Sequence, residues 1–178
     1  MPHEASDPAP RLESDRLLLR GHRLEDFEDC LAMWSDPEVT RYVGGEPLSG
    51  EEVWARLQRY AGHWSLFGFG FWLVAEKTSG QFLGEVGFAD ARRQIAPSFE
   101  GIPEIGWAFA RWAWGRGYAE EAVRTALAWG ERHFPPGQET GCLINPDHQA
   151  SIRLAEKCGY RLFCRTFYKD QPALIYRR

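Results

Sequence analysis

The sequence predicts a mixed α/β domain, in which a central twisted mixed sheet of about seven strands packs against about four helices. Two observations carry this prediction. Short apolar runs bounded by glycine or polar turns alternate with longer segments whose apolar residues recur every three or four positions. Their order is one strand, two helices, three strands, a helix, a strand, a helix and two strands, which places a strand–helix–strand unit in the second half.

The first half of the chain begins with a proline-rich stretch, residues 1–13, that lacks periodicity and is predicted to be a flexible tail. A single domain is expected over residues 14–178, because 178 residues with 44% hydrophobic types suffice for one sizeable core. The apolar run 16–20 suits a buried first strand. Apolar spacing then predicts a helix over 24–34, which the Asp-Pro pair at 36–37 ends.

The remaining elements follow from the same two periodicities. Ser49 suits an N-cap, with Glu52 three residues on, so a second long helix is expected to start there and to stop at the glycines of 68–70. The later elements are a hairpin of strands 71–75 and 82–88, a strand over 104–109, a helix from Gly117 to about 134, a strand over 142–144, a helix over 147–158 and two final strands.

Composition excludes several classes of partner. Lys and Arg number 21 against 25 Asp and Glu, so the net charge of −4 offers no basic field for nucleic acid. There is no apolar run long enough to span a bilayer and no apolar stretch typical of a signal peptide, so we expect a cytoplasmic protein without a membrane partner. The cysteines are dispersed and lack metal-ligand spacing, which predicts neither a disulfide nor a metal: Cys30, Cys142, Cys158 and Cys164.

The segment 114–121 is the most informative for chemistry. Its glycines, Gly115 and Gly117, stand where a predicted strand leads into a long helix, so backbone N–H groups and the helix dipole can hold an anion such as a pyrophosphate. A glycine-rich dinucleotide loop follows the first strand of a βαβ unit instead. Because this segment comes late, after a hairpin, a nucleotide-binding oxidoreductase is disfavoured.

These residues resemble the GCN5-related N-acetyltransferases, whose acetyl-CoA motif reads [Gln/Arg]-x-x-Gly-x-[Gly/Ala]. Residues 114–119 match it as Trp-Gly-Arg-Gly-Tyr-Ala, a form familiar from the branch that includes the ribosomal-protein alanine N-acetyltransferases. The segments 150–160, 17–20 and 34–39 resemble the same branch, so the likeness runs from about Leu12 to the end. It implies the GNAT fold and acetyl-CoA as the co-substrate.

The resemblance also implies how CoA is held. Backbone amides of the loop would bind the pyrophosphate: Arg116, Gly117, Tyr118 and Ala119. Residues of the preceding strand would pair with the pantetheine amides: Trp107, Ala108 and Phe109. The side chains of Arg111 and Arg116 are left open between CoA phosphates and solvent.

The sequence departs from the family in the helix over 147–158. His148 stands where Asn is usual; it could help to bind CoA or be only a surface residue, and the surface role is favoured. Ala155 occupies the position of a Tyr that protonates the leaving thiolate in many members. Ser151 then becomes the candidate to hydrogen-bond the CoA thiolate or a water beside it, with an ordinary role near the helix start as the alternative.

Transfer to an amine needs an amine lone pair, an oxyanion stabiliser and a hydrogen-bond donor for the sulfur. At pH 7 deprotonation costs about 4–5 kcal/mol for a lysine amine but only about 1 kcal/mol for an α-amine. Glu104, on the strand that leads to the loop, is the first candidate base and Glu85 the second. We expect a backbone N–H in strand 107–109, where the family has a bulge, to stabilise the oxyanion.

Aromatic residues could line the acceptor pocket. Trp34, Trp72 and Tyr168 are expected to be packing residues, and Tyr42, beside Arg41, is the favoured pocket residue. The resulting hypothesis is an acetyl-CoA-dependent N-acetyltransferase whose acceptor is a protein N-terminal amine or a small-molecule amine. A non-catalytic acyl-CoA-binding or regulatory module is the alternative, and a homodimer is one option for its assembly.

Overall fold

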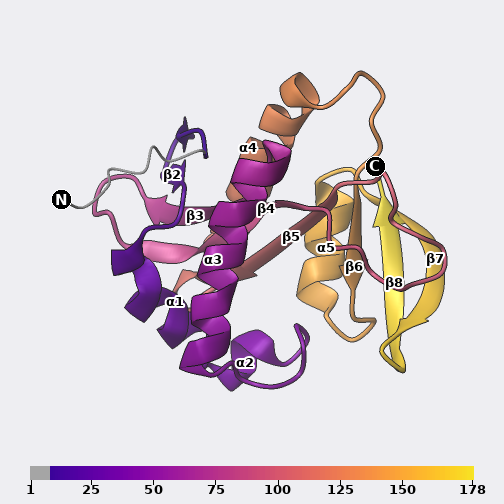
Figure 1. Ribbon diagram of the computed structural model, residues 1–178, viewed down its shortest axis with the longest axis horizontal. Coiled ribbons are helices and arrows are strands. Elements are labelled where there is room, and N and C mark those ends of the chain that lie inside the picture. Colours follow the sequence, from indigo (N-terminus) through magenta and orange to yellow (C-terminus); the bar gives the residue numbers. More distant parts are fainter. Residues whose placement is uncertain (1–8) are drawn as a thin grey trace.

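One mixed sheet organises the protein in the computed structural model, which describes residues 9–178 (Figure 1). Its eight strands lie in the order β1-β2-β3-β4-β5-β6-β8-β7. Only β5 and β6 pair in parallel, and the other neighbours are antiparallel. The strands are β1 (Leu12–Glu13), β2 (Leu17–Arg20), β3 (Phe71–Glu76), β4 (Phe82–Ala89), β5 (Glu104–Phe109), β6 (Gly141–Ile144), β7 (Arg161–Tyr168) and β8 (Gln171–Arg177).

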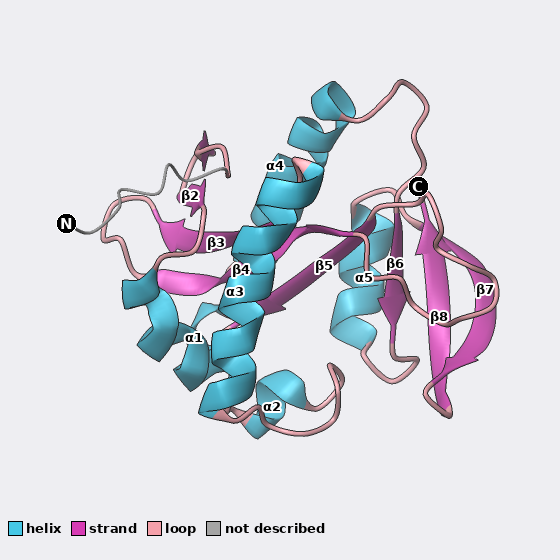
Figure 2. Cartoon of the chain, in the orientation of Figure 1, coloured by secondary structure: helices cyan, strands magenta, loops and turns pink. Residues whose placement is uncertain are grey.

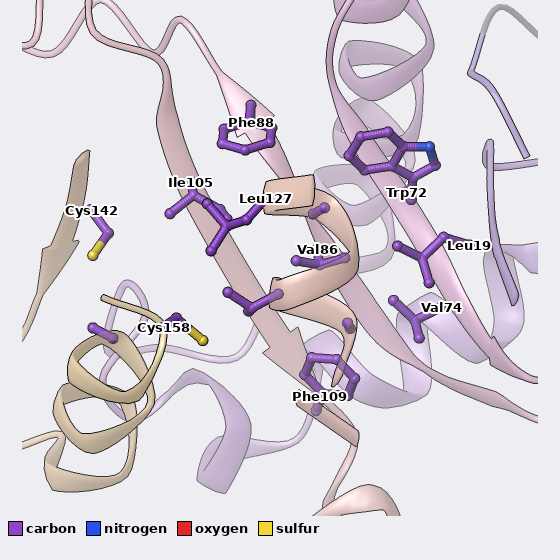
Figure 3. Packing of buried hydrophobic residues seen from close by; sticks show 14 of the residues in the cluster. Leu19, Trp72, Val74, Val86, Phe88, Ile105, Phe109, Leu127, Cys142 and Cys158 are labelled. Atoms are coloured by element: carbon purple, nitrogen blue, oxygen red, sulfur yellow. The ribbon is translucent and has the colours of Figure 1, made fainter. Parts of the chain in front are cut away.

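Helices cover both faces of this sheet. They are α1 (Phe27–Trp34), α2 (Pro37–Thr40), α3 (Gly50–Phe67), α4 (Tyr118–His133) and α5 (Gln149–Lys157), with short 3₁₀ turns at Leu24–Asp26 and Arg111–Ala113. One core joins the sheet to α4 and α5, and Figure 3 shows Leu127 of α4 beside Val86, Phe88 and Ile105. A second core joins the opposite face to α1, α2 and α3.

Local chemistry explains the boundaries of the long helix α3. Ser49 caps it by accepting a hydrogen bond from the Glu52 N–H, while the Glu52 carboxylate accepts one from the Ser49 N–H at 2.8 Å. Gly68 ends it in the left-handed region, at φ 70°. The cap and stop predicted from the sequence are therefore confirmed, and so is the mixed α/β fold class.

Two elements correct the predicted inventory. Residues 1–8 lie outside the described residues, but Leu12–Glu13 pair with β2, and Trp72 Nε1 donates to the Pro10 carbonyl at 2.9 Å. The end of the predicted tail is therefore part of the fold. The turn α2 was also missed, although Pro37 at the first position and Asp36 as the cap are its ordinary signals.

A buried polar network fastens α1 and α3 to β4. The Glu85 side chain is completely buried, and its carboxylate accepts hydrogen bonds from Trp34 Nε1 at 3.1 Å and Tyr60 Oη at 3.0 Å. His22 Nε2 lies 3.2 Å from the other oxygen. Burial acts to raise the pKa of Glu85, but the hydrogen bond and electrostatic attraction of His22, the charge of Arg56 and the hydrogen bond from Tyr60 hold it below its ordinary value.

The close approach of β4 to the chain before β3 leads to a stability prediction. A Cβ at Gly87 would lie 2.3 Å from the Gly70 carbonyl oxygen, so Gly87→Ala should lower the free energy of unfolding by roughly 1–3 kcal/mol. Gly62 is the matched control, because it lies in α3 with open space around its Cβ, and Gly62→Ala should raise stability by about 0.5–1 kcal/mol. Urea denaturation measures both, and equal effects of the two substitutions would contradict the assigned packing.

The network around Glu85 leads to a second stability prediction. Glu85→Gln leaves its donors without a carboxylate and should lower the free energy of unfolding by about 3 kcal/mol at pH 7. Since the folded-state pKa lies below the ordinary 4.5, the contribution of the carboxylate is complete above about pH 4.5 and disappears as the pH falls through the folded-state pKa.

The difference between the parent and Glu85→Gln should therefore shrink in denaturation curves taken at decreasing pH. The exposed Glu46 provides the control, and Glu46→Gln should change stability by less than about 0.5 kcal/mol. A difference that stays constant from pH 7 down to pH 3 would show that the charge on Glu85 does not stabilise the fold.

Candidate active site

The two parallel strands in the middle of the sheet separate after a single pair. β5 stays in register with β4 along its whole length, from Glu104 opposite Ala89 to Phe109 opposite Gly84. Within residues 9–178, the ladder between β5 and β6 consists of Glu104 opposite Gly141 alone. Figure 2 shows the strands diverging toward their C-terminal ends, with α5 beside β6. One edge of β5 is therefore left open.

The hydrogen-bond pattern identifies which backbone groups face this split. Ala110 donates to the Leu83 carbonyl in β4, and the Pro103 carbonyl accepts from Gly141 in β6. The direction alternates along an antiparallel strand, so Trp107 and Phe109 turn their N–H groups toward the split, whereas Ala108 turns its own toward β4. Of the three residues predicted to pair with pantetheine, Ala108 is thus engaged within the sheet.

The bulge expected in strand 107–109 is not there. The register between β4 and β5 is continuous, and the register shifts lie instead in β3, between Val74 and Ala75, and in β7, between Leu162 and Cys164. The open amides of β5 arise from the divergence of β6. The sequence therefore predicted unpaired amides on the correct strand, but it attributed them to a bulge instead of to the divergence of β6.

The loop at the end of β5 leaves the start of α4 without a side-chain cap. Gly115 and Gly117 have φ of 73° and 78°, which side chains rarely adopt. Gly117 is the N-cap of α4 and has no side-chain oxygen to satisfy the first amides of the helix. Trp114, where the family motif has Gln or Arg, donates from its indole nitrogen to the Phe109 carbonyl at 2.7 Å. These features suit an anion at the start of α4.

A residue from the turn between β1 and β2 supports this loop. The Arg16 guanidinium donates to the Arg116 carbonyl at 2.9 Å, pairs with Glu121 at 2.7 Å and lies 4.6 Å from the centre of the Tyr118 ring. The Tyr118 hydroxyl donates to Glu76 at 3.0 Å. No local pattern points to these contacts, because Arg16 lies 100 residues before Arg116.

The candidate Ser151 lies in a cluster that joins three elements. It is buried, its Oγ accepts from Trp107 Nε1 at 3.1 Å, and it lies 3.3 Å from His148 Nε2. The His148 ring stacks on Tyr42 at 4.7 Å between centroids. The expectation that His148 is only a surface residue is therefore wrong, since it is half-buried and its burial lowers its pKa.

Glu104 occupies the other end of β5, where the strands still pair. Its side chain is 10% exposed, and its two oxygens accept from Arg93 at 2.6 and 2.8 Å. Arg93 comes from the loop after β4 and lies 4.9 Å from the centre of the Tyr168 ring. Burial opposes the charge of Arg93, but the hydrogen bonds and negative charge of Glu104 raise its pKa overall. Sequence reasoning missed Arg93 as a partner.

Other candidates are buried or paired with residues of the fold. Glu85 is inaccessible, so its carboxylate cannot touch an acceptor amine, and the second candidate base is excluded. Trp34 and Trp72 are buried core residues, as expected. Arg111 pairs at 2.9 Å with Asp36, the cap of α2.

The fold also brings together three metal-ligating side chains that sequence spacing did not suggest. Ligand atoms of His22, Cys30 and Glu85 lie within 4.8 Å of one another. Burial, reinforced by the charge of Glu85, raises the pKa of the Cys30 thiol far above its ordinary value, which opposes the thiolate that a metal needs. All four cysteines are free. In the described part of the chain, no helix is long and apolar enough to cross a membrane.

Known proteins resemble this chain in sequence and in fold. The acetyltransferase (GNAT) domain family matches residues 16–161. YkkB of Bacillus subtilis, an uncharacterized protein, is 34% identical and the match covers 94% of this chain and 95% of that protein. The N-acetyltransferase YoaA of the same organism, also uncharacterized, is 29% identical over 85% of this chain and 83% of its own.

Solved structures agree with these matches. A GnaT-family structure from Bordetella pertussis is 31% identical and superimposes with a TM-score of 0.83, over 95% of this chain and 99% of the other. The fold is shared too with RimL, a ribosomal L7/L12 α-N-protein acetyltransferase solved with coenzyme A, at 15% identity and a TM-score of 0.75, over 95% and 97% of the two chains. The resemblance to this family is thereby confirmed, and this chain belongs to the GNAT family of acetyltransferases.

Proposed function

We propose that this acetyltransferase uses acetyl-CoA as the donor and a primary amine as the acceptor. The observation that carries the proposal is the split between β5 and β6, which opens toward the bare N-terminus of α4. A long, thin ligand with a diphosphate at one end and amides along its arm matches this combination. Coenzyme A has that chemistry.

In this proposal the amides of residues 116–119 bind the pyrophosphate, aided by the partial positive charge of the helix start. The pantetheine arm lies along β5 and pairs with the open backbone groups of Trp107 and Phe109. Ala108 contributes only through its place in the strand, because its own backbone groups are directed at β4. The acetyl end then lies deeper in the split, near Ser151 and the pair Glu104–Gly141.

The reaction follows from these positions. The amine lone pair attacks the thioester carbonyl, and the backbone N–H of Trp107 stabilises the resulting oxyanion, while the Trp107 carbonyl and the backbone groups of Phe109 pair with the pantetheine arm. The C–S bond then breaks with its electron pair on sulfur, and the Ser151 hydroxyl hydrogen-bonds that sulfur. Glu104 receives the proton of the amine through a water, since Arg93 already holds one lone pair of each carboxylate oxygen.

The acceptor is proposed to be an α-amine of a protein N-terminus or a small-molecule amine. Glu104 is a weak base, because it is paired with Arg93 and reaches the amine only through water. An α-amine suits such a base, since it needs only about 1 kcal/mol to lose its proton at pH 7. RimL, which shares the fold, is an α-N-protein acetyltransferase and thus supports the protein N-terminus, although at 15% identity the likeness extends to the fold alone.

The alternative is a module that binds acyl-CoA without turnover. Ala155 favours it, because no tyrosine is present at the position where many relatives carry one. Thiol release from acetyl-CoA, measured over a library of α-amines, lysine peptides and small amines, separates the two. Tight binding without thiol release in any of them would favour the module.

We propose further that no metal is required, that the protein works in the cytoplasm, and that neither nucleic acid nor a membrane is a partner. A homodimer is one possible assembly of the protein.

A substitution in the loop tests the binding assignment. Gly117→Val places a branched side chain at φ 78° beside the proposed pyrophosphate, so calorimetry should show at least a tenfold weaker acetyl-CoA affinity, or about 1.4 kcal/mol. Gly137→Val is the matched control, because Gly137 has the same φ in a loop away from the split. Unchanged affinity in a folded Gly117→Val protein would remove the loop from the binding site.

A substitution at the carboxylate tests the base. Glu104→Gln should lower turnover by about 10²-fold at pH 7 and recover in part at higher pH, where more amine is neutral. The control is Arg93→Gln, which removes the same ion pair but keeps the carboxylate. Equal losses in both variants, without recovery at high pH, would make Glu104 a structural residue.

A further inference from the structure

Side chains from β5 and from the start of α5 meet at the hydroxyl of Ser151, and the two hydrogen-bonding groups beside it differ in kind. Trp107 Nε1, at 3.1 Å, carries a hydrogen and can only donate. His148 Nε2, at 3.3 Å, can donate or accept, depending on which ring nitrogen holds the proton. A serine hydroxyl has one hydrogen and two acceptor positions. The indole therefore always fills one acceptor position of the serine oxygen. The protonation of His148 Nε2 determines whether the second acceptor position or the hydroxyl hydrogen is used next.

His148 is held in place on both sides. The backbone N–H of His148 donates to the Asn145 carbonyl at 2.9 Å. Its backbone carbonyl accepts from the Ile152 N–H at 3.1 Å, where α5 begins. The ring stacks on Tyr42, with an interplanar angle of 22°. Because burial lowers its pKa, the imidazole is neutral near pH 7 and carries a single N–H.

The two tautomers have opposite consequences for Ser151. With the proton on Nδ1, Nε2 accepts the serine hydrogen, and the hydroxyl has nothing to offer a ligand in the split. With the proton on Nε2, both acceptor positions of Ser151 are filled, by Trp107 and His148. The single hydroxyl hydrogen must then point elsewhere, and the developing negative charge on the CoA sulfur is its strongest available acceptor.

We infer that His148 is a positioning residue, which donates from Nε2 to Ser151 and thereby sets the serine hydroxyl as a hydrogen-bond donor to the departing sulfur. The inference rests on the proposed function, in which that sulfur lies beside Ser151. No proton leaves the serine: the C–S bond breaks, its electron pair stays on sulfur, and the hydrogen bond stabilises that charge. The departure from the family's asparagine thus retains a donor and adds a ring that stacks on Tyr42.

The test separates the donor from the ring. His148→Phe keeps an aromatic ring against Tyr42 but removes the N–H, whereas His148→Gln restores an N–H at about the distance of Nε2. In single-turnover acetyl transfer at saturating acetyl-CoA, His148→Phe should be about tenfold slower than the parent and His148→Gln within about threefold. Calorimetry should give acetyl-CoA affinities within about twofold of the parent for both, and thermal melts check folding.

A double variant shows whether His148 acts through Ser151. Ser151→Ala alone should slow the chemical step by about 10–10³-fold. Adding His148→Phe to it should cause no further loss, because the group that His148 orients is already gone. A further loss in the double variant, or a parental rate in His148→Phe, would overturn the inference and leave the proposed function intact.

A spectroscopic measurement keeps the test independent of the variants. Nitrogen NMR of the ¹⁵N-histidine-labelled parent, with coenzyme A bound, should show the His148 proton on Nε2, and a proton mainly on Nδ1 would overturn the inference. Failure of the proposed function has a different signature: the parent transfers no acetyl group to any amine, or Ser151→Ala transfers it at the parental rate. Either result removes the role on which the inference rests.

Discussion

The site depends on one pair of residues, Glu104 and Gly141, that joins two parallel strands and has no successor. A ladder that continued would consume the backbone groups of β5 and close the sheet. A ladder that was absent would leave β6, α5 and the C-terminal hairpin without a fixed place beside β5. Because the pairing stops after one step, the strands are both anchored and open, and amides that would otherwise be satisfied face the split.

The loop that follows β5 is held from a distant part of the chain. Its glycines can adopt left-handed backbone conformations, but they can adopt many others as well, so the glycines alone do not fix the loop. Arg16 does so by bonding the Arg116 carbonyl while it pairs with Glu121 in the first turn of α4. Trp114 adds a hydrogen bond back to the end of β5. The start of α4 is thus ordered by contacts within the protein, which lowers the ordering cost of the CoA binding proposed for this loop.

The two candidate carboxylates show why residue type does not decide a role. Glu85 and Glu104 lie on adjacent strands, and both are buried. Glu85 is enclosed by Trp34, Tyr60 and His22, and its hydrogen bonds connect α1 and α3 to β4. Glu104 has a small exposed fraction and a single arginine partner at the closed end of the split. Of the two, only Glu104 is open to the water that the proposed proton transfer requires.

Local patterns determined most of the helices and strands, the cap at Ser49 and the glycine loop at 114–119, because periodicity, capping and turn chemistry act over a few residues. The sequence also indicated the family, whose motif is contiguous. The pairing of Glu104 with Arg93, the support from Arg16 and the stack of His148 on Tyr42 join residues 11 to more than 100 positions apart. Such contacts follow from the strand order and the divergence of β6, and these arise only when the whole sheet has assembled.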